Sequence, residues 1–169
     1  MGFTEISPWD FQTDPFSLVG KRKMLLSASD ARGTNVMTVA WGGFGVMWGA
    51  PCAFFAIRPS RYTYTFAEAG ECFSLMSLSA AYDGALSYCG AHSGREGDKL
   101  VAAGLTPLVL PSGCFAVSEA ELVFDLQKLY THPITPSEFW SRESVDKWYG
   151  KGDFHKLYFA EVKKIYRKE

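Results

Sequence analysis

The stretch between Asn35 and Thr63 most constrains how this chain can fold, because it reads as strand, glycine-rich connection, strand and helix start. Its first part, residues 35–41, alternates small with large side chains. Strand geometry would place Val36, Thr38 and Ala40 on one face and Met37, Val39 and Trp41 on the other. A face of small, weakly polar groups leaves room for a flat ligand, although the same alternation also fits an ordinary core strand.

The second strand pattern, residues 51–57, is apolar on both faces and runs into Arg58-Pro59-Ser60-Arg61-Tyr62-Thr63. We expect Ser60 to cap a helix there, so that the free N–H groups of the first turn lie between two arginines. Such a helix start is suited to holding a phosphate. The alternative is a capped helix with two surface arginines.

A third segment, residues 92–99, combines two glycines with Ser93 and Arg95. This composition is typical of a loop that contacts anions through its backbone and side chains. A solvated corner between two helices explains the segment equally well. Together, the three segments suggest a ring-bearing, phosphorylated cofactor.

Composition limits the other functions. The net charge of −1 gives no general attraction to nucleic acid or to an anionic membrane, so an anion site must be local. No apolar run is long enough to span a bilayer, and the N-terminus lacks the pattern of a secretory signal. We therefore expect a cytoplasmic protein, in which the four separated cysteines are small buried hydrophobes.

The order of patterns predicts a single domain over residues 1–169, with an irregular lead-in over residues 1–20. Strands are expected at 23–29, 35–41, 51–57, 72–78, 121–130 and 154–166, and short helices at 60–70, 79–92, 98–103 and 138–148. The segment 42–49 is too long for a two-residue hairpin and is expected to be a flap or a partner contact, and 105–118 is expected to be irregular. Strands interrupted by short helices do not alternate as in a doubly wound sheet. We therefore predict a mainly-β antiparallel barrel with helical insertions.

Several kinds of catalytic site find no support in the sequence. The glycine-rich stretches match neither a Walker loop nor a dinucleotide fingerprint. His92, His132 and His155 lack the close spacing of a metal site. No nucleophile elbow or acid–base pair can be recognised. We expect no metal and no catalytic side chain.

With these segments identified, the chain resembles the flavin reductase-like family of FMN-binding proteins. The resemblance covers roughly residues 20–166 and rests on NVMTVAWGGFGVMWGAPCAFFAIRPSRYTYTF at 35–66 and YCGAHSGREGDK at 88–99. KLY at 128–130 and the aromatic final strand agree with it. The resemblance implies a Greek-key split β-barrel, a homodimer and FMN bound near the subunit interface.

The resemblance also implies roles for single residues. Those expected to bind FMN are Asn35, Met37, Thr38, Val39, Ala40 and Trp41 along the ring, Arg58, Ser60, Arg61, Tyr62 and Thr63 at the phosphate, and Ser93, Gly94 and Arg95 for further contacts. In such a flavoprotein the flavin performs the redox chemistry and the protein supplies binding and tuning.

Two functions remain open at this point. The first is an oxidoreductase that reduces flavin or another small acceptor with NADH or NADPH through bound FMN. The second is a non-catalytic, flavoredoxin-like electron-transfer protein that serves a redox partner protein.

Overall fold

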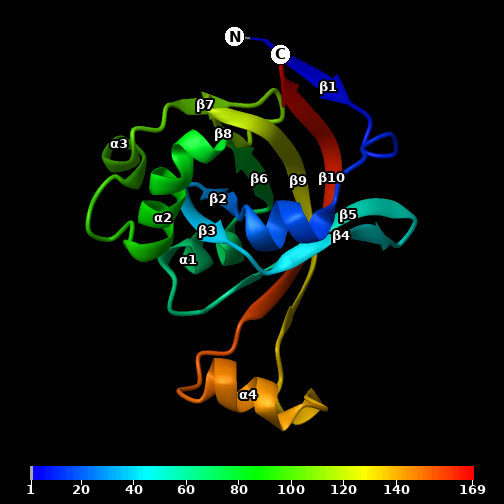
Figure 1. Cartoon of the computed structure of the whole chain (residues 1–169), viewed down its shortest axis with the longest axis vertical. Helices are drawn as coiled ribbons and strands as arrows, with labels where there is room; N and C mark the ends of the chain where they lie inside the picture. The colour runs from blue at the N-terminus through cyan, green and yellow to red at the C-terminus, as the bar shows by residue number, and fades with distance from the viewer. Residues whose placement is uncertain (1) are drawn as a thin grey trace.

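A computed structural model describes residues 2–169 as a curved antiparallel sheet with short helices gathered at one side (Figure 1). The strands are β1 (Phe3–Ile6), β2 (Met24–Asp30), β3 (Gly33–Val39), β4 (Gly42–Met47), β5 (Ala50–Ile57), β6 (Cys72–Leu78), β7 (Pro107–Val109), β8 (Phe115–Val117), β9 (Ala120–Pro133) and β10 (Lys156–Lys168). The helices are α1 (Tyr62–Ala69), α2 (Asp83–Ala91), α3 (Lys99–Ala103) and α4 (Arg142–Tyr149), and the short helical turns are η1 (Phe16–Lys21), η2 (Ala80–Tyr82) and η3 (Pro136–Glu138).

The main sheet has the order β3-β2-β6-β9-β10-β5-β4, with β1 added against β10. Its two end strands, β3 and β4, are separated in the chain by only Ala40 and Trp41, so the sheet must curl until its ends meet. The Trp41 carbonyl accepts a hydrogen bond from the Ala56 amide at 3.3 Å. Among residues 2–169, β3 and β4 form no ladder with each other, and the barrel is open at that seam. The predicted mainly-β, antiparallel split barrel is confirmed.

Two hydrophobic clusters occupy the two faces of the sheet. Met37 and Val39 belong to a cluster that includes Phe55 and Phe124. Val36 belongs to the other cluster, which includes Leu86 from α2. The alternation predicted for residues 36–39 is therefore confirmed. Its small-residue face is partly covered by α2, however, because the Thr38 hydroxyl donates to the Leu86 carbonyl at 2.5 Å.

The predicted flap at residues 42–49 is instead a tight hairpin. β4 pairs with β5 in a register that places Met47 opposite Ala50. Trp48 and Gly49 form the two-residue turn, and both have positive φ angles, 52° and 77°. Two positive φ angles define the turn that suits the twist of a hairpin. Tryptophan is an unusual residue at this position, which is why the sequence did not indicate the turn.

Other expectations need smaller corrections. The lead-in contains a strand, β1, and the segment 105–118 contains the hairpin of β7 with β8. β9 is buried on both faces, because Val123 and Asp125 are as inaccessible as Phe124 and Leu126. The four cysteines are not alike: Cys72 and Cys114 form a disulfide, whereas Cys52 and Cys89 are buried thiols, as expected.

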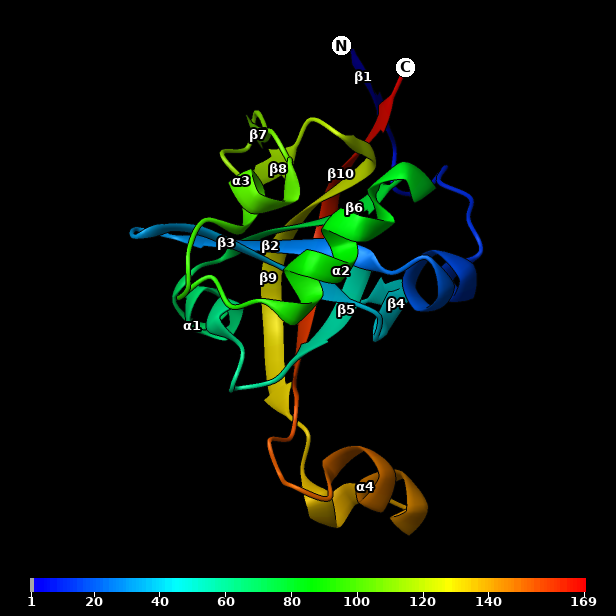
Figure 2. The ribbon, with the colours of Figure 1, turned by 60° about the vertical axis from the view of Figure 1, so that its left-hand side comes forward.

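An arm formed by residues 134–155 carries α4 away from the sheet between β9 and β10 (Figure 2). At its base, the Trp41 ring lies 5.0 Å from the Trp148 ring and 4.6 Å from the His155 ring, centroid to centroid. Burial lowers the pKa of His155 to about 4, and its Nδ1 lies 2.8 Å from the Tyr149 hydroxyl. His155 is thus a neutral side chain within an aromatic cluster.

No helix among residues 2–169 is long and apolar enough to cross a membrane.

The end of α1 depends on a close backbone approach at Gly70. A Cβ atom at Gly70 would lie 1.8 Å from the Ser29 carbonyl oxygen of β2. We expect Gly70→Ala to lower the free energy of unfolding by about 2 kcal/mol or more, since the backbone must shift to relieve this overlap. Urea denaturation measures the change. Gly20→Ala is the control, because its Cβ would meet no atom within 4 Å. Equal stability of the two variants would contradict the prediction.

Candidate functional site

The three segments selected from the sequence meet at the side chain of Asn35. Asn35 lies on β3 and is buried, and its Nδ2 donates to Thr63 Oγ1, in the first turn of α1, at 2.7 Å. Gly94 packs on the same amide: a Cβ there would lie 2.1 Å from Asn35 Oδ1 and 3.1 Å from the Tyr62 ring. One buried amide therefore joins β3, the start of α1 and the loop that follows α2.

A cavity of about 160 Å³ lies where α1 begins and α2 ends. Its lining residues come from two of the predicted segments and the start of α3: Ser60, Arg61, Tyr62, Thr63, Ala91, His92, Ser93, Gly94, Arg95, Glu96 and Lys99. The first amides of α1 have no acceptor within the helix, because the first turn of any helix lacks one. We call this space the anion cavity.

Three cationic side chains surround the anion cavity without a carboxylate partner. Arg61, Arg95 and Lys99 take part in none of the ion pairs formed within residues 2–169. Arg61 donates instead to the Gly90 carbonyl, and the Arg95 guanidinium lies over the Tyr62 ring, 4.6 Å from its centroid. Like charges gathered without a counter-ion favour the entry of an anion.

Lys99 lies in the selected segment 92–99 but was not among the residues predicted to bind FMN. It is 6% exposed, and its Nζ donates to the Cys89 carbonyl at 3.1 Å and the His92 carbonyl at 3.3 Å. It therefore holds the last carbonyls of α2 and the loop that carries Ser93. Burial, with a contribution from the Arg61 charge, lowers the pKa of Lys99 to about 8. Its only signal in the sequence is the Asp98-Lys99 pair, in which Asp98 caps α3.

Ser60 lines the anion cavity, but its hydrogen-bond donors and those of Arg58 are engaged by the arm. Ser60 is not the helix cap: Arg61 holds that position, and no side chain caps α1. The Ser60 hydroxyl donates to Asp153 Oδ2 at 2.6 Å, and its amide donates to Asp153 Oδ1 at 3.2 Å. Arg58 donates to the carbonyls of Asp153 and Trp148. A carboxylate from the arm thus occupies the donors that the sequence predicted for a phosphate.

Asp153 could not be identified from local patterns. It has a φ angle of 56°, in the left-handed region that few residues other than glycine adopt, and it follows Gly152, whose φ is 77°. This backbone geometry turns its carboxylate toward Ser60. The contact joins residues 93 positions apart, so it depends on how the arm folds back onto the barrel.

The segment predicted to contact a ring lies beside the anion cavity and does not line it. The side chains of Met37 and Val39 point into the core and can offer a ligand only their backbone. Thr38, Ala40 and Trp41 are partly exposed. They adjoin the anion cavity through Gly90, whose Cβ would lie 3.3 Å from Thr38 Cβ and whose carbonyl accepts from Arg61. The site thus combines three partly exposed residues at the end of β3, Thr38, Ala40 and Trp41, called the open face below, with a cavity lined by cations.

The family assignment follows from comparison with known proteins. The model of the family described as flavin reductase like domain matches residues 17–166. This chain belongs to the flavin reductase-like family. No curated protein sequence gives a significant match.

Solved structures share the fold at low sequence identity. An FMN-binding domain of a flavin reductase-like enzyme from Shewanella baltica is 15% identical, with a TM-score of 0.70 over 98% of this chain and 77% of that chain. Flavoredoxin of Desulfovibrio vulgaris is 22% identical, with a TM-score of 0.67 over 87% of this chain and 69% of that chain. An NADH:FAD oxidoreductase from Streptomyces globisporus is 12% identical, with a TM-score of 0.65 over 86% of this chain and 74% of that chain.

The buried charge of Lys99 makes stability depend on pH in a defined direction. The pKa of Lys99 is lowered from 10.5 in the unfolded chain to about 8 in the folded protein. Between these values the unfolded state binds more protons, so this group stabilises the folded protein increasingly as pH rises. We expect the free energy of unfolding of the natural protein, minus that of Lys99→Met, to increase by about 1 kcal/mol from pH 7.5 to 9.5.

Urea denaturation of both proteins at the two pH values measures this difference. Subtracting the free energy of unfolding of Lys99→Met removes the contributions of the other titrating groups, because both proteins contain them. Lys128→Met is the control. Burial also lowers the pKa of Lys128, but the charges of nearby Glu68 and Glu71 oppose that lowering. A difference that stays constant or decreases with pH would show that Lys99 keeps its ordinary pKa.

Proposed function

We propose that this chain binds FMN and acts as an oxidoreductase that reduces flavin or another small acceptor with electrons from NADH or NADPH. The observation that carries the proposal is the anion cavity, where Arg61, Arg95 and Lys99 converge without a carboxylate partner among the described residues. When bound, FMN supplies the hydride and electron chemistry. The protein then needs only to hold and orient it.

The residues present fit this cofactor in two parts. The phosphate monoester carries roughly two negative charges at neutral pH and would enter the anion cavity. There it would meet the side chains of Arg61, Ser93 and Arg95 and the helix-start amides near Tyr62 and Thr63. The ring would lie on the open face at the end of β3, against Thr38, Ala40 and Trp41 and the backbone of residues 37 and 39. Asn35 holds the two parts in register.

Arg58 and Ser60 differ from the other residues proposed to bind the phosphate. The Ser60 hydroxyl and amide donate to the Asp153 carboxylate, and Arg58 donates to the Asp153 carbonyl. They can contact the phosphate only if the Asp153 carboxylate leaves Ser60, which exchanges one anion for another. Arg61, Thr63 and Gly94 need no such exchange.

The proteins with the same fold support a flavin function without deciding its type. One is an FMN-binding domain, one is a flavoredoxin and one is an NADH:FAD oxidoreductase. A flavin-binding protein fits all three comparisons. We further propose that the chain is a single domain and acts in the cytoplasm. A disulfide such as Cys72–Cys114 is uncommon in a reducing cytoplasm, so thiol titration of the protein isolated without oxidation tests the proposed location.

An electron-transfer protein is the second candidate, and the arm favours it. Trp140 lies on the arm and is fully exposed, and Trp148 is 48% exposed. Large apolar side chains presented on a projection are typical of contact surfaces for other proteins. A redox partner docked on the arm would lie near Trp41 and therefore near the proposed ring face.

An anaerobic spectroscopic titration separates these functions. We expect the purified protein loaded with FMN to show flavin absorption that bleaches when NADH or NADPH is added. Flavin that bleaches with dithionite but with neither nucleotide would instead identify the electron-transfer protein. A protein that cannot be loaded with FMN would overturn both proposals.

Removing Arg61 should weaken FMN binding while the fold is kept. We expect Arg61→Ala to raise the Kd for FMN by about tenfold or more, since a charge-assisted hydrogen bond to phosphate is worth roughly 1.5–3 kcal/mol. Fluorescence titration of FMN measures the Kd, and riboflavin, which lacks the phosphate, should bind both proteins equally. Arg22→Ala is the matched control, because Arg22 pairs with Glu121 outside the cavity. Unchanged FMN affinity in Arg61→Ala would place the phosphate elsewhere.

A homodimer is part of the proposal because the β4–β5 hairpin and the neighbouring strands present an apolar patch. Exposed large side chains there are Val46, Met47, Trp48, Phe54, Leu129 and Tyr130. The Trp48 ring lies 5.8 Å from the Tyr130 ring. Phe44 of the same hairpin is instead directed inward, and its ring lies 4.6 Å from the Phe124 ring, centroid to centroid. Patches of this kind are usually covered by another protein surface.

Light scattering at micromolar concentration tests the dimer. We expect the natural protein to be a dimer and Trp48→Asn to shift it toward monomer, since asparagine removes the ring and tolerates the positive φ. Trp140→Asn removes a still more exposed tryptophan from the arm and should leave the dimer intact. A monomeric natural protein would contradict the prediction.

A further inference from the structure

The arm is fastened to the barrel at two points, and both involve residues proposed to bind FMN. At the first, the Ser60 hydroxyl and amide donate to the Asp153 carboxylate at 2.6 and 3.2 Å, and Arg58 donates to the Asp153 carbonyl at 2.8 Å. At the second, the Trp41 ring lies nearly at right angles to the Trp148 ring, with 5.0 Å between their centroids. The arm therefore engages both the phosphate end and the ring end of the proposed site.

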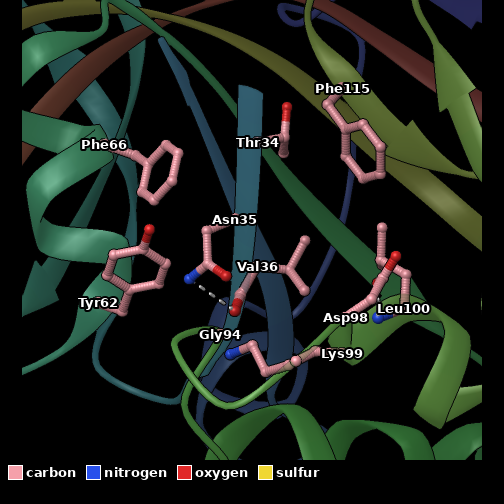
Figure 3. Close-up of a pocket in the computed structure, with 11 residues that line it drawn as sticks. Thr34, Asn35, Val36, Tyr62, Phe66, Gly94, Asp98, Lys99, Leu100 and Phe115 are labelled. Carbon is pink, nitrogen blue, oxygen red and sulfur yellow. Dashed lines mark hydrogen bonds between the residues drawn. The ribbon is translucent and has the colours of Figure 1, made fainter. Parts of the chain in front are cut away.

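One wall of the anion cavity is fixed from inside the barrel. Tyr62, Gly94 and Lys99 line the anion cavity and also a neighbouring cavity of about 490 Å³. Figure 3 shows them from that neighbouring cavity, with Tyr62 beside Asn35 and Gly94 near Lys99. Moving this wall would break the buried contacts of the Asn35 amide and of Lys99. Ser60 is exposed and its donors are held by the arm, so the Ser60 side of the cavity is the side that can change.

The contact at Ser60 joins groups that are accessible to water. The Asp153 side chain is 33% exposed and that of Arg58 is 28% exposed, and Arg58 Nη1 lies 4.0 Å from Asp153 Oδ2. Water screens ion pairs at such positions, so they contribute little to stability. In addition, Asp153 has a φ angle of 56°, a left-handed conformation that costs residues other than glycine energy. The Asp153 carboxylate can therefore leave Ser60 at small cost.

A phosphate and the Asp153 carboxylate cannot both use the donors of Ser60. The hydroxyl and the amide of Ser60 each carry one hydrogen, and both donate to Asp153. A phosphate monoester carries roughly two negative charges, against one on the carboxylate. It would also lie among Arg61, Arg95 and Lys99, which line the cavity. The phosphate is therefore the stronger acceptor at this position.

We propose that Asp153 is an internal competitor of the flavin phosphate, so that phosphate binding detaches the arm and uncovers Trp41 for the flavin ring. The part that concerns the ring rests on the proposed flavin function, whereas displacement of Asp153 requires only a phosphate. Detachment frees the donors of Arg58 and Ser60 and separates Trp41 from Trp148. The arm thereby links occupation of the anion cavity to exposure of the open face. No covalent bond is made or broken.

Replacing the carboxylate should tighten the binding of FMN. Asparagine keeps the shape of Asp153 and tolerates its φ angle, but its neutral amide is a weaker competitor for Ser60. We expect Asp153→Asn to lower the Kd for FMN about fivefold or more, because the observed Kd rises as the fraction of molecules with a free site falls. Asp146→Asn is the matched control, since it removes a carboxylate of the same arm that is not an acceptor of Ser60, and it should leave the Kd unchanged. Fluorescence titration of FMN measures both constants.

Hydrogen–deuterium exchange of the natural protein measures detachment, with inorganic phosphate as the probe. α4 has eight residues, and a helix of that length is marginal once it loses its contacts. We expect phosphate to speed exchange of the α4 amides about fivefold or more and to slow exchange of the amides that line the anion cavity. Sodium chloride at the same ionic strength is the control and should do neither. In Asp153→Asn the α4 amides should exchange faster before phosphate is added.

A second substitution tests whether Asp153 acts through Ser60. In a Ser60→Ala background the hydroxyl is absent, so we expect Asp153→Asn to lower the Kd for FMN by about twofold or less. The effects of two residues in contact are not additive, whereas those of independent residues are. An equal effect of Asp153→Asn in both backgrounds would mean that its charge acts at a distance, and the inference would be overturned.

The outcomes separate the inference from the proposed function. If inorganic phosphate detaches the arm but FMN does not bind, the proposed function fails and displacement of Asp153 by phosphate is supported. If FMN binds equally to the natural protein and to Asp153→Asn, and phosphate leaves the exchange of α4 unchanged, the inference is overturned while the proposed function stands. Equal tightening of FMN by Asp153→Asn and Asp146→Asn would show a general effect of charge and would also overturn the inference. If neither FMN nor phosphate binds, both fail.

Discussion

The hydrogen bond between Asn35 and Thr63 is the interaction on which the rest of the site depends. Both side chains are buried, and each is on a different element, so the bond fixes the start of α1 against β3. Gly94 can approach only because it lacks a Cβ, and this brings the loop after α2 to the same point. Removing either partner would leave a buried polar group unsatisfied, which costs about 1–3 kcal/mol and loosens all three segments together.

The charges near the Asn35–Thr63 hydrogen bond are not those that the overall composition would suggest. The chain has a net charge of −1, and six of its 17 lysines and arginines form ion pairs among residues 2–169. Arg61, Arg95 and Lys99 are among those that form none, and they gather at one cavity, where Lys99 is held by two carbonyl groups in place of a counter-ion. The folded chain thus stores unfavourable charge at one end of the site. A bound anion would relieve it, which is how a preorganised site gains selectivity for phosphate.

The sequence predicted the strands well where periodicity or apolar length was strong, as at residues 51–57 and 72–78, and it identified the three segments that meet at Asn35. It failed where the deciding contact is distant. The disulfide joins cysteines 42 residues apart, and the contact of Ser60 with Asp153 depends on the arm folding back. The hairpin turn at Trp48 and Gly49 was missed because its backbone overrides the preference of tryptophan.

The division of the arginines in Arg58-Pro59-Ser60-Arg61 shows why a motif alone does not define a site. Residues 58–61 form a turn in which the Arg61 amide donates to the Arg58 carbonyl at 3.0 Å. Arg58 and Ser60 contact the arm, whereas Arg61, as the helix cap, contacts α2. Three residues apart in sequence, the two guanidiniums thereby serve different neighbours. Arg58 and Ser60 fasten the arm through Trp148 and Asp153, and Arg61 meets the anion cavity. If Asp153 moved away from Ser60, the donors of Arg58 and Ser60 would be released from the arm and could turn toward the anion cavity. The position of the arm would thereby change which donors are available to a phosphate.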